Sequence, residues 1–320
     1  LNIDSEDEGV FTVGCAGGMD ARALLPFIAD ESLPGHSACR LVGGGMSGGH
    51  SGIDIIEERA NAIKLLFRCI HAISQQTDVR ISSVNGGTAR NAIPRDAEAM
   101  LLIPSTDGEL AGDLVKDLER RLQAEYAKTD PNLTMKLTGG NDVCLATSAA
   151  TTRRAIDLVF AYPDGVTAMS KDLEDLVETS NNLATIKVED GKLIILSNQR
   201  SSNMDSLALL CDRIMSVARL AGAEGETSGG YPSWQPNMES ELLARCLDVY
   251  RARFKKEPVV EAIHAGLECG IIGAKYEGMD MISFGPTIKS PHSPDEKIEI
   301  ESIGQVWEFM VALFQSYKQD

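Results

Sequence analysis

The chain has 320 residues, 43% of them hydrophobic, and a formal net charge of −17 at pH 7. This acidity disfavours nucleic acids and anionic membranes as partners and favours cations, including divalent metals. The seven cysteines are scattered, odd in number and contain no C-x-x-C pair, which argues against a disulfide framework or a cysteine zinc site and favours a reducing, cytoplasmic compartment.

Strands and helices are predicted to alternate in the first part of the chain. Val10–Cys15 is predicted as a short strand, and a turn-rich passage near residues 32–37 marks the start of a new unit. Apolar residues then recur at helical spacing through Ile53–Ser74. Val79–Val84 and Ala97–Ile103 are predicted as two further strands. A second helix is predicted from a leucine repeat at Leu110, Leu114, Leu118 and Leu122.

The same order of elements then returns. Leu133–Leu137 is predicted as a strand and Thr151–Tyr162 as a helix, followed by a hairpin around Glu189-Asp190-Gly191 and a helix at Ser206–Leu220. From this order, rather than from residue identity, we predict that an α+β unit is duplicated across roughly residues 38–222.

The chain changes character at Gly229. A loop rich in proline and aromatic residues precedes further predicted elements, which are a helix at Ser240–Phe254, strands at Val259–Ile263 and Met281–Phe284, and a helix at Ile303–Tyr317. Alternating strands and helices indicate an α/β layer. We therefore predict one α/β domain formed by residues 1–20 and 229–320 and interrupted by an insert of residues 21–228.

Two residues at opposite ends of the chain are candidate metal ligands. Asp4 follows apolar Leu1 and Ile3, as a carboxylate does at a strand end, and His292 lies in a proline-flanked run beside carboxylates. Oxygen and imidazole donors together suit zinc, which needs about four ligands. Further donors would come from residues outside this chain or from Glu6, Glu8, Asp295 and Glu296. The alternative for Asp4 is an acidic surface loop.

His50 and Asn91 are candidates for stabilising charge on a reacting carbonyl. Glycines on both sides of His50 leave its imidazole accessible as a hydrogen-bond donor to an oxyanion. The alternative is that Ser51 caps a helix and His50 has no role. Asn91 lies just before Pro94, in a stretch held extended, and the alternative is that its amide only satisfies the turn.

Substrate-binding candidates lie after two other strands. Arg200 ends a predicted strand, and its guanidinium could clamp a substrate carboxylate or form a surface ion pair with Asp205. The segment from His264 to Gly270 runs from a strand into a helix start, where α/β sheets place ligands. Glu268 and the amides around Gly266 could meet an amine or carboxylate, whereas His264 fits a packed histidine equally well.

Several motifs together resemble the aminoacyl-histidine dipeptidase (Xaa-His dipeptidase) branch of the zinc-dependent M20 peptidases. The most specific are His-Ala-Gly-Leu-Glu-Cys-Gly and Gly-Pro-x(4)-Pro-His-Ser-Pro-Asp-Glu. The resemblance spans the chain and rests on Asn2–Gly18, Gly48–Gly52, Asn85–Ala97, Gly229–Pro236, His264–Gly270 and Gly285–Glu301.

The resemblance implies a two-zinc hydrolase whose catalytic domain is interrupted by a lid. Asp4 and His292 would be terminal ligands of different zinc ions. His50 would polarise the scissile carbonyl with Asn91 beside it, and Arg200 would hold the substrate's C-terminal carboxylate. The family's other ligands and its general base precede the segment that matches this chain's first residue, so we expect a partial catalytic domain that is inactive alone.

The resemblance thus predicts hydrolysis of dipeptides of the Xaa-His type by a metal-activated water. Its predicted partners are the dipeptide and, as an open question, a second copy of the chain in a homodimer. Two alternatives remain. One is an inert binding or regulatory module with a vestigial metal site, and the other is an M20-type hydrolase of N-acyl or carbamoyl amino acids.

Overall fold

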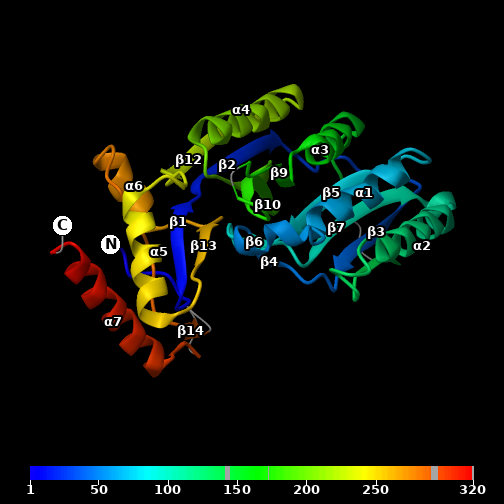
Figure 1. Cartoon of the computed structure of the whole chain (residues 1–320). Helices are drawn as coiled ribbons and strands as arrows, with labels where there is room; N and C mark the ends of the chain where they lie inside the picture. The colour runs from blue at the N-terminus through cyan, green and yellow to red at the C-terminus, as the bar shows by residue number, and fades with distance from the viewer. Residues whose placement is uncertain (141–144, 172, 290–294, 319–320) are drawn as a thin grey trace.

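The computed structural model describes residues 1–140, 145–171, 173–289 and 295–318, and it confirms a mixed α/β fold. Figure 1 shows two parts, a broad sheet with helices and a smaller α/β unit in which the blue N-terminal strand lies among yellow and red elements from the end of the chain. None of the helices in these ranges is long and apolar enough to cross a membrane.

The larger part is built on one antiparallel sheet, with the order β12-β2-β11-β10-β5-β7-β3-β8 among the described residues and β9 paired to β10 beside this path. The first and second halves of this sheet meet where β5 and β10 pair, at Gly86 with Ile186 and Asn85 with Lys187. The strands are β2 (Gly17–Pro26), β3 (His36–Gly44), β5 (Arg80–Gly86), β7 (Ala97–Pro104), β8 (Thr134–Gly139), β9 (Gly165–Met169), β10 (Val177–Glu189), β11 (Lys192–Ser201) and β12 (Glu224–Tyr231).

Four helices cover this sheet: α1 (Ala62–Ser74), α2 (Gly108–Glu125), α3 (Ala149–Ala161) and α4 (Met204–Leu220). One face of the sheet is apolar and needs this cover, as β2 shows. Its side chains alternate between the two faces, so that Ala21, Ala23 and Leu25 are fully buried while Arg22 is partly exposed. Helix α1 packs on β3 and β7, and α4 packs on β2, β11 and β12. The main hydrophobic core lies between these helices and the sheet.

The smaller part joins the two ends of the chain. Strand β1 (Val10–Cys15) pairs in parallel with β13 (Val259–Ile263). Helices α5 (Glu241–Phe254), α6 (Glu268–Lys275) and α7 (Ile300–Ser316) complete this part, with the short strands β14 (Ile288–Lys289) and β15 (Lys297–Ile298). Its core is an aromatic cluster formed by Phe11, Tyr250, Phe284 and Phe309.

Two predicted elements differ from the structure. The helix predicted over Ile53–Ser74 is split into a 3-10 helix, η1 (Ile53–Glu57), and α1, because Glu58 adopts a left-handed φ of 50° and the Asn61 side chain caps α1. The strand predicted at Met281–Phe284 is reduced to isolated bridges from Ser283 to Asn2 and Thr12.

The two parts meet where the chain passes between them twice. Cys15 and Trp234 exchange both backbone hydrogen bonds, at 2.8 and 3.0 Å, and Tyr231 pairs with Gly18 as the last residue of β12. The predicted boundary between residues 20 and 21 falls within β2. The ends of β2, β10 and β11 at this junction carry the polar side chains described next.

Candidate functional site

Buried polar side chains occupy the ends of three neighbouring strands at the junction. Residues directly opposite each other in an antiparallel ladder project to the same face of the sheet. Every polar residue in this set is at most 8% exposed, although charged and amide residues are rarely buried. These residues form two rows across β10, β11 and β2. One row contains Ser180 and Arg200 and ends at Gly18, and the next contains Asn182, Asn198 and Asp20.

The guanidinium of Arg200 is buried and is held only by neutral groups. Its Nε and Nη2 each lie 3.4 Å from the Ser51 hydroxyl, and its Nη1 donates to the Tyr231 hydroxyl at 3.1 Å. Among the described residues no carboxylate forms an ion pair with it, so the alternative of a surface pair with Asp205 is wrong. Burial lowers the pKa of Arg200, which means that an anionic ligand would stabilise this cation.

A chain of hydrogen bonds fixes the group that contacts Arg200. The Ser51 hydroxyl donates to Asn198 Oδ1 at 3.3 Å, and Asn198 Nδ2 donates to Asp20 Oδ1 at 2.8 Å. At the far end of this series of hydrogen bonds, Arg90 Nη1 donates to Asp20 Oδ2 at 2.9 Å. Asp20 is therefore neutralised by Arg90 and reaches Arg200 only through two neutral side chains.

His50 lies in the short strand β4 (Gly49–His50), which pairs with β6 (Ala92–Ile93). Its Nδ1 accepts hydrogen bonds from the backbone amides of Gly52 and Ile53, both at 3.2 Å. A ring nitrogen that accepts carries no proton, so the neutral imidazole has its hydrogen on Nε2. The ring itself caps η1 while Ser51 faces Arg200, which makes the alternative of Ser51 as the cap wrong.

Asn91 is brought beside His50 by the backbone. The Ser51 amide donates to the Asn91 carbonyl at 2.8 Å, next to the pairing of β4 with β6. The Asn91 side chain is exposed and is not occupied by these bonds. The structure thus places His50 on β4 beside Asn91, which lies in the turn immediately before β6.

His264 connects the smaller part to the larger one. Its Nε2 lies 2.7 Å from the Ser180 hydroxyl, and its side chain is buried. Burial, and then the nearby charge of Arg200, lowers the pKa of His264 to about 3, so the ring is neutral. The sequence alone left open whether this histidine is packed or functional. The structure shows it packed against the candidate site.

Gly266 lies on the loop that follows His264, and Glu268 is the first residue of α6, which this loop enters. Both residues are exposed. A Cβ placed on Gly266 would lie 2.9 Å from the Tyr231 ring, which also contacts Arg200. Tyr231 was not predicted as a site residue, because its position between glycines and a proline indicated only a loop.

Of the two candidate metal ligands, Asp4 belongs to the described residues. Asp4 is exposed, and the chain beside it packs closely on Gly285, since a Cβ on Gly285 would overlap the Ser5 carbonyl. His292 lies outside the described residues. Within the described ranges no group of three or more His, Cys, Asp or Glu side chains is placed to hold a metal. Asp4 alone does not make a zinc site, so we derive no reaction step through a metal.

Glu8, a further donor considered for the metal, contacts the core of the smaller part instead. Glu8 Oε1 accepts a hydrogen bond from the Tyr250 hydroxyl at 2.8 Å. Cys269 is buried, and burial raises the pKa of its thiol to about 11, so the thiol is protonated near neutral pH and is a poor nucleophile.

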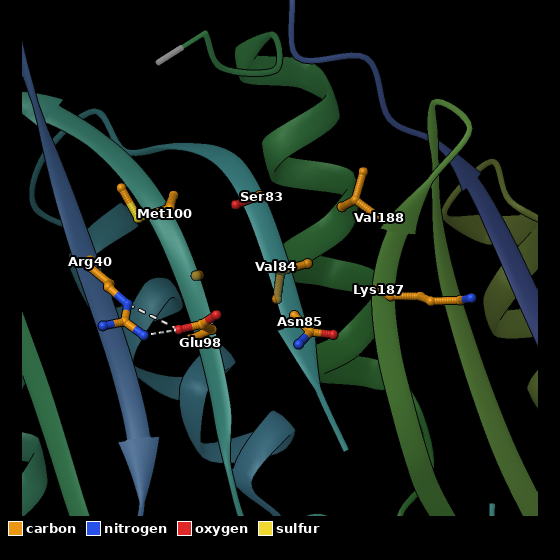
Figure 2. A pocket seen from close by; sticks show the side chains of 9 residues that line it. Arg40, Ser83, Val84, Asn85, Glu98, Met100, Lys187 and Val188 are labelled. Carbon is orange, nitrogen blue, oxygen red and sulfur yellow. Dashed lines mark hydrogen bonds and ion pairs between the residues drawn. The ribbon is translucent and has the colours of Figure 1, made fainter. Parts of the chain in front are cut away.

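A separate hollow lies on the open face of the larger sheet. It has a volume of about 270 Å³ and lies among β3, β5, β7 and β10. Figure 2 shows Arg40 and Glu98 joined by an ion pair on one side and Lys187 on the other. A larger hollow of about 670 Å³ is lined by Trp234, Tyr276 and Asp280 of the smaller part. Neither hollow contains a predicted site residue.

The chain matches known proteins in sequence and in structure. Residues 44–130 match the M20 peptidase dimerisation domain. The cytosol non-specific dipeptidase of Escherichia coli (strain K12) is 37% identical over 318 residues, which cover 98% of this chain and 65% of that protein. The crystal structure of aminoacylhistidine dipeptidase from Vibrio alginolyticus superposes with a TM-score of 0.94 at 38% identity, covering 99% of this chain and 64% of that one. The chain thus spans just under two thirds of the length of either relative.

Proposed function

The chain belongs to the M20 family of peptidases, and from this membership we propose that the protein hydrolyses dipeptides with a free C-terminal carboxylate. Both similar proteins are named as dipeptidases, one non-specific and one for aminoacyl-histidine. Because this chain covers only part of their length, the activity is proposed for the whole protein. The Xaa-His preference is the more specific form of this proposal.

The buried guanidinium of Arg200 carries the proposal. Within the part of the chain that the structure describes, this cation is held only by the hydroxyls of Ser51 and Tyr231, so its charge is poorly compensated in a site of low dielectric constant. A carboxylate would supply the missing charge and accept two parallel hydrogen bonds from the guanidinium. A dipeptide carries one such group at its C-terminus, at a fixed distance from its single peptide bond.

His50 would act on that peptide bond. Because its Nδ1 is occupied by two backbone amides, the ring presents Nε2–H as a donor for the carbonyl oxygen. A fixed donor of this kind stabilises the negative charge that develops when water attacks. We propose that the exposed amide of Asn91 assists, and that Gly266 and Glu268 contact the rest of the substrate.

Zinc, with Asp4 and His292 as ligands, stays a prediction. The position of Asp4 beside the Gly285 segment supports it, because this segment leads toward His292 in the chain. A homodimer is proposed from the match to a dimerisation domain, and a cytoplasmic location from the name of the Escherichia coli relative.

A substrate panel tests the proposed function. The protein expressed from its complete coding sequence should cleave Xaa-His and other dipeptides, lose activity on treatment with a chelator, and leave C-terminally amidated dipeptides nearly uncut. Faster cleavage of N-acyl or N-carbamoyl amino acids would favour the other M20 hydrolases. Dipeptide binding without any hydrolysis in the presence of divalent metal would favour an inert binding module.

A further inference from the structure

We propose that Tyr231 is a second ligand of the substrate carboxylate, so that a phenol and the guanidinium of Arg200 together form the anion pocket. This inference rests on the proposed function and specifies how the substrate class is recognised. It also assigns a direct binding role to the last residue of β12, from which the chain returns to the smaller part.

The hydrogen-bond pattern of the phenol supports this role. Arg200 Nη1 donates to the Tyr231 hydroxyl at 3.1 Å, so the phenol oxygen acts as an acceptor in this contact. The single hydrogen of the hydroxyl has no acceptor among the described residues. By contrast, the hydrogen of the other hydroxyl on Arg200, that of Ser51, is donated to Asn198. The Tyr231 hydroxyl is thus a vacant donor beside an uncompensated cation.

Two glycines fix where this hydroxyl points. A Cβ on Gly18 would lie 2.5 Å from both Cζ and the hydroxyl oxygen of Tyr231, and a Cβ on Gly266 would lie 2.9 Å from Cε2. The ring therefore occupies space that any other residue at these positions would fill. Because Gly266 is itself a predicted substrate residue, the phenol lies between the proposed carboxylate ligand and the loop proposed to contact the substrate.

The backbone around Tyr231 is also fixed before any ligand arrives. Tyr231 pairs with Gly18 at the end of β12, and Trp234 is held to Cys15 by two backbone hydrogen bonds. A donor held on such a frame loses little conformational entropy on binding. A carboxylate oxygen could then accept from the guanidinium and the phenol at once, whereas a C-terminal amide offers no negative charge to either group.

Replacing Tyr231 by Phe in the full-length protein tests the inference, because it removes only the hydroxyl. The KM for a dipeptide should rise about tenfold or more, as expected for a lost hydrogen bond to a charged group, while kcat changes little. Inhibition by the C-terminal amide of the same dipeptide should be unaffected. The matched control is Tyr276→Phe, since Tyr276 is 60% exposed and lines the hollow of the smaller part, which contains no predicted site residue.

Two results would overturn the inference. In one, Tyr231→Phe weakens the dipeptide and its amide equally, which would mean that the phenol only supports the fold. In the other, Tyr231→Phe leaves the KM unchanged while Arg200→Ala raises it, so that the proposed function survives without the second ligand. If neither substitution alters the preference for a free carboxylate, the assignment of Arg200 as a carboxylate ligand fails as well, whereas the proposed function itself fails only if the parent protein shows no such preference. Calorimetric binding of a free amino acid gives the same comparison without turnover.

Discussion

Gly52 of the large sheet's loop lies directly against the backbone of His264 in the smaller part. A Cβ on Gly52 would overlap the His264 carbonyl oxygen and would lie 3.3 Å from Nε of Arg200. The His264 ring also contacts Ser180 on the same side of the sheet. Close packing at Gly52 therefore fixes the His50 loop, Arg200 and the loop that follows His264 in position relative to one another.

Gly52→Ala should separate these groups. The backbone at Gly52 has a φ of −102°, which alanine adopts freely, so the cost is steric rather than conformational. Overpacking of this kind typically destabilises by about 1–3 kcal/mol, and we expect kcat/KM to fall at least about tenfold because the site spans the contact. Denaturant titration and steady-state kinetics measure both effects.

The matched control is Gly112→Ala. Gly112 lies within α2 with no atom near its missing Cβ, so alanine there should stabilise the helix by up to about 1 kcal/mol and leave kinetics unchanged. Equal activity of the two variants would show that the contact between Gly52 and His264 is not needed for catalysis.

His264 should make the protein less stable in mild acid. The pKa of this buried ring is about 3 in the folded state, below the ordinary value of 6.5. Between these values the unfolded chain binds more protons, so the free energy of unfolding decreases as pH falls below 6.5 and is fully retained above it. The loss from His264 is about 1.4 kcal/mol per pH unit, or about 2 kcal/mol at pH 5.

His264→Asn isolates this contribution, because asparagine keeps a partner for the Ser180 hydroxyl but does not titrate. The difference in unfolding free energy between pH 7.5 and pH 5 should be smaller in the variant by about 2 kcal/mol. Denaturant titrations at the two pH values measure it. An identical pH dependence in parent and variant would mean that the ring is hydrated and protonates normally.

His50→Ala should slow turnover more than it weakens binding. Removing one donor from a developing oxyanion typically lowers kcat by about 10²–10³ and changes KM little. A control is His36→Gln, because His36 lies at the start of β3 and pairs with Asp78 instead of the site. A rise in KM at constant kcat for His50→Ala would instead assign His50 to ground-state binding.

Local patterns predicted much of the fold. The predicted strands Val10–Cys15 and Val259–Ile263 have the same bounds in the structure, since both are compact apolar runs. Strand β2 was missed because it begins with Gly17-Gly18 and contains charged residues. Strand β12 was missed because it is an exposed edge strand with several glycines. The turn of the predicted hairpin was confirmed, with positive φ at Asp190 and Gly191.

The candidate site was less accessible to sequence reasoning. His50 and Arg200 were identified individually, but Asp20 and Asn198 meet only because β2 and β11 pair across 178 positions. Single-sequence periodicity carries no information about which strands become neighbours. The role of Tyr231 depends likewise on a long-range pairing, that of β12 with β2, which brings Gly18 under its ring.

Arg90→Met should loosen the Asn91 loop without destabilising the protein. The Arg90 side chain is 62% exposed, so its ion pair with Asp20 contributes less than about 1 kcal/mol to global stability. Locally, however, it ties the loop between β5 and β6 to β2, and we expect faster amide hydrogen exchange in residues 87–92 and a several-fold lower kcat/KM. Raising the ionic strength should shift the parent toward the variant. The control is Arg153→Met, which removes a similarly exposed ion pair with Asp157 on α3. If both variants exchange and turn over alike, the Arg90–Asp20 pair has no role in positioning Asn91.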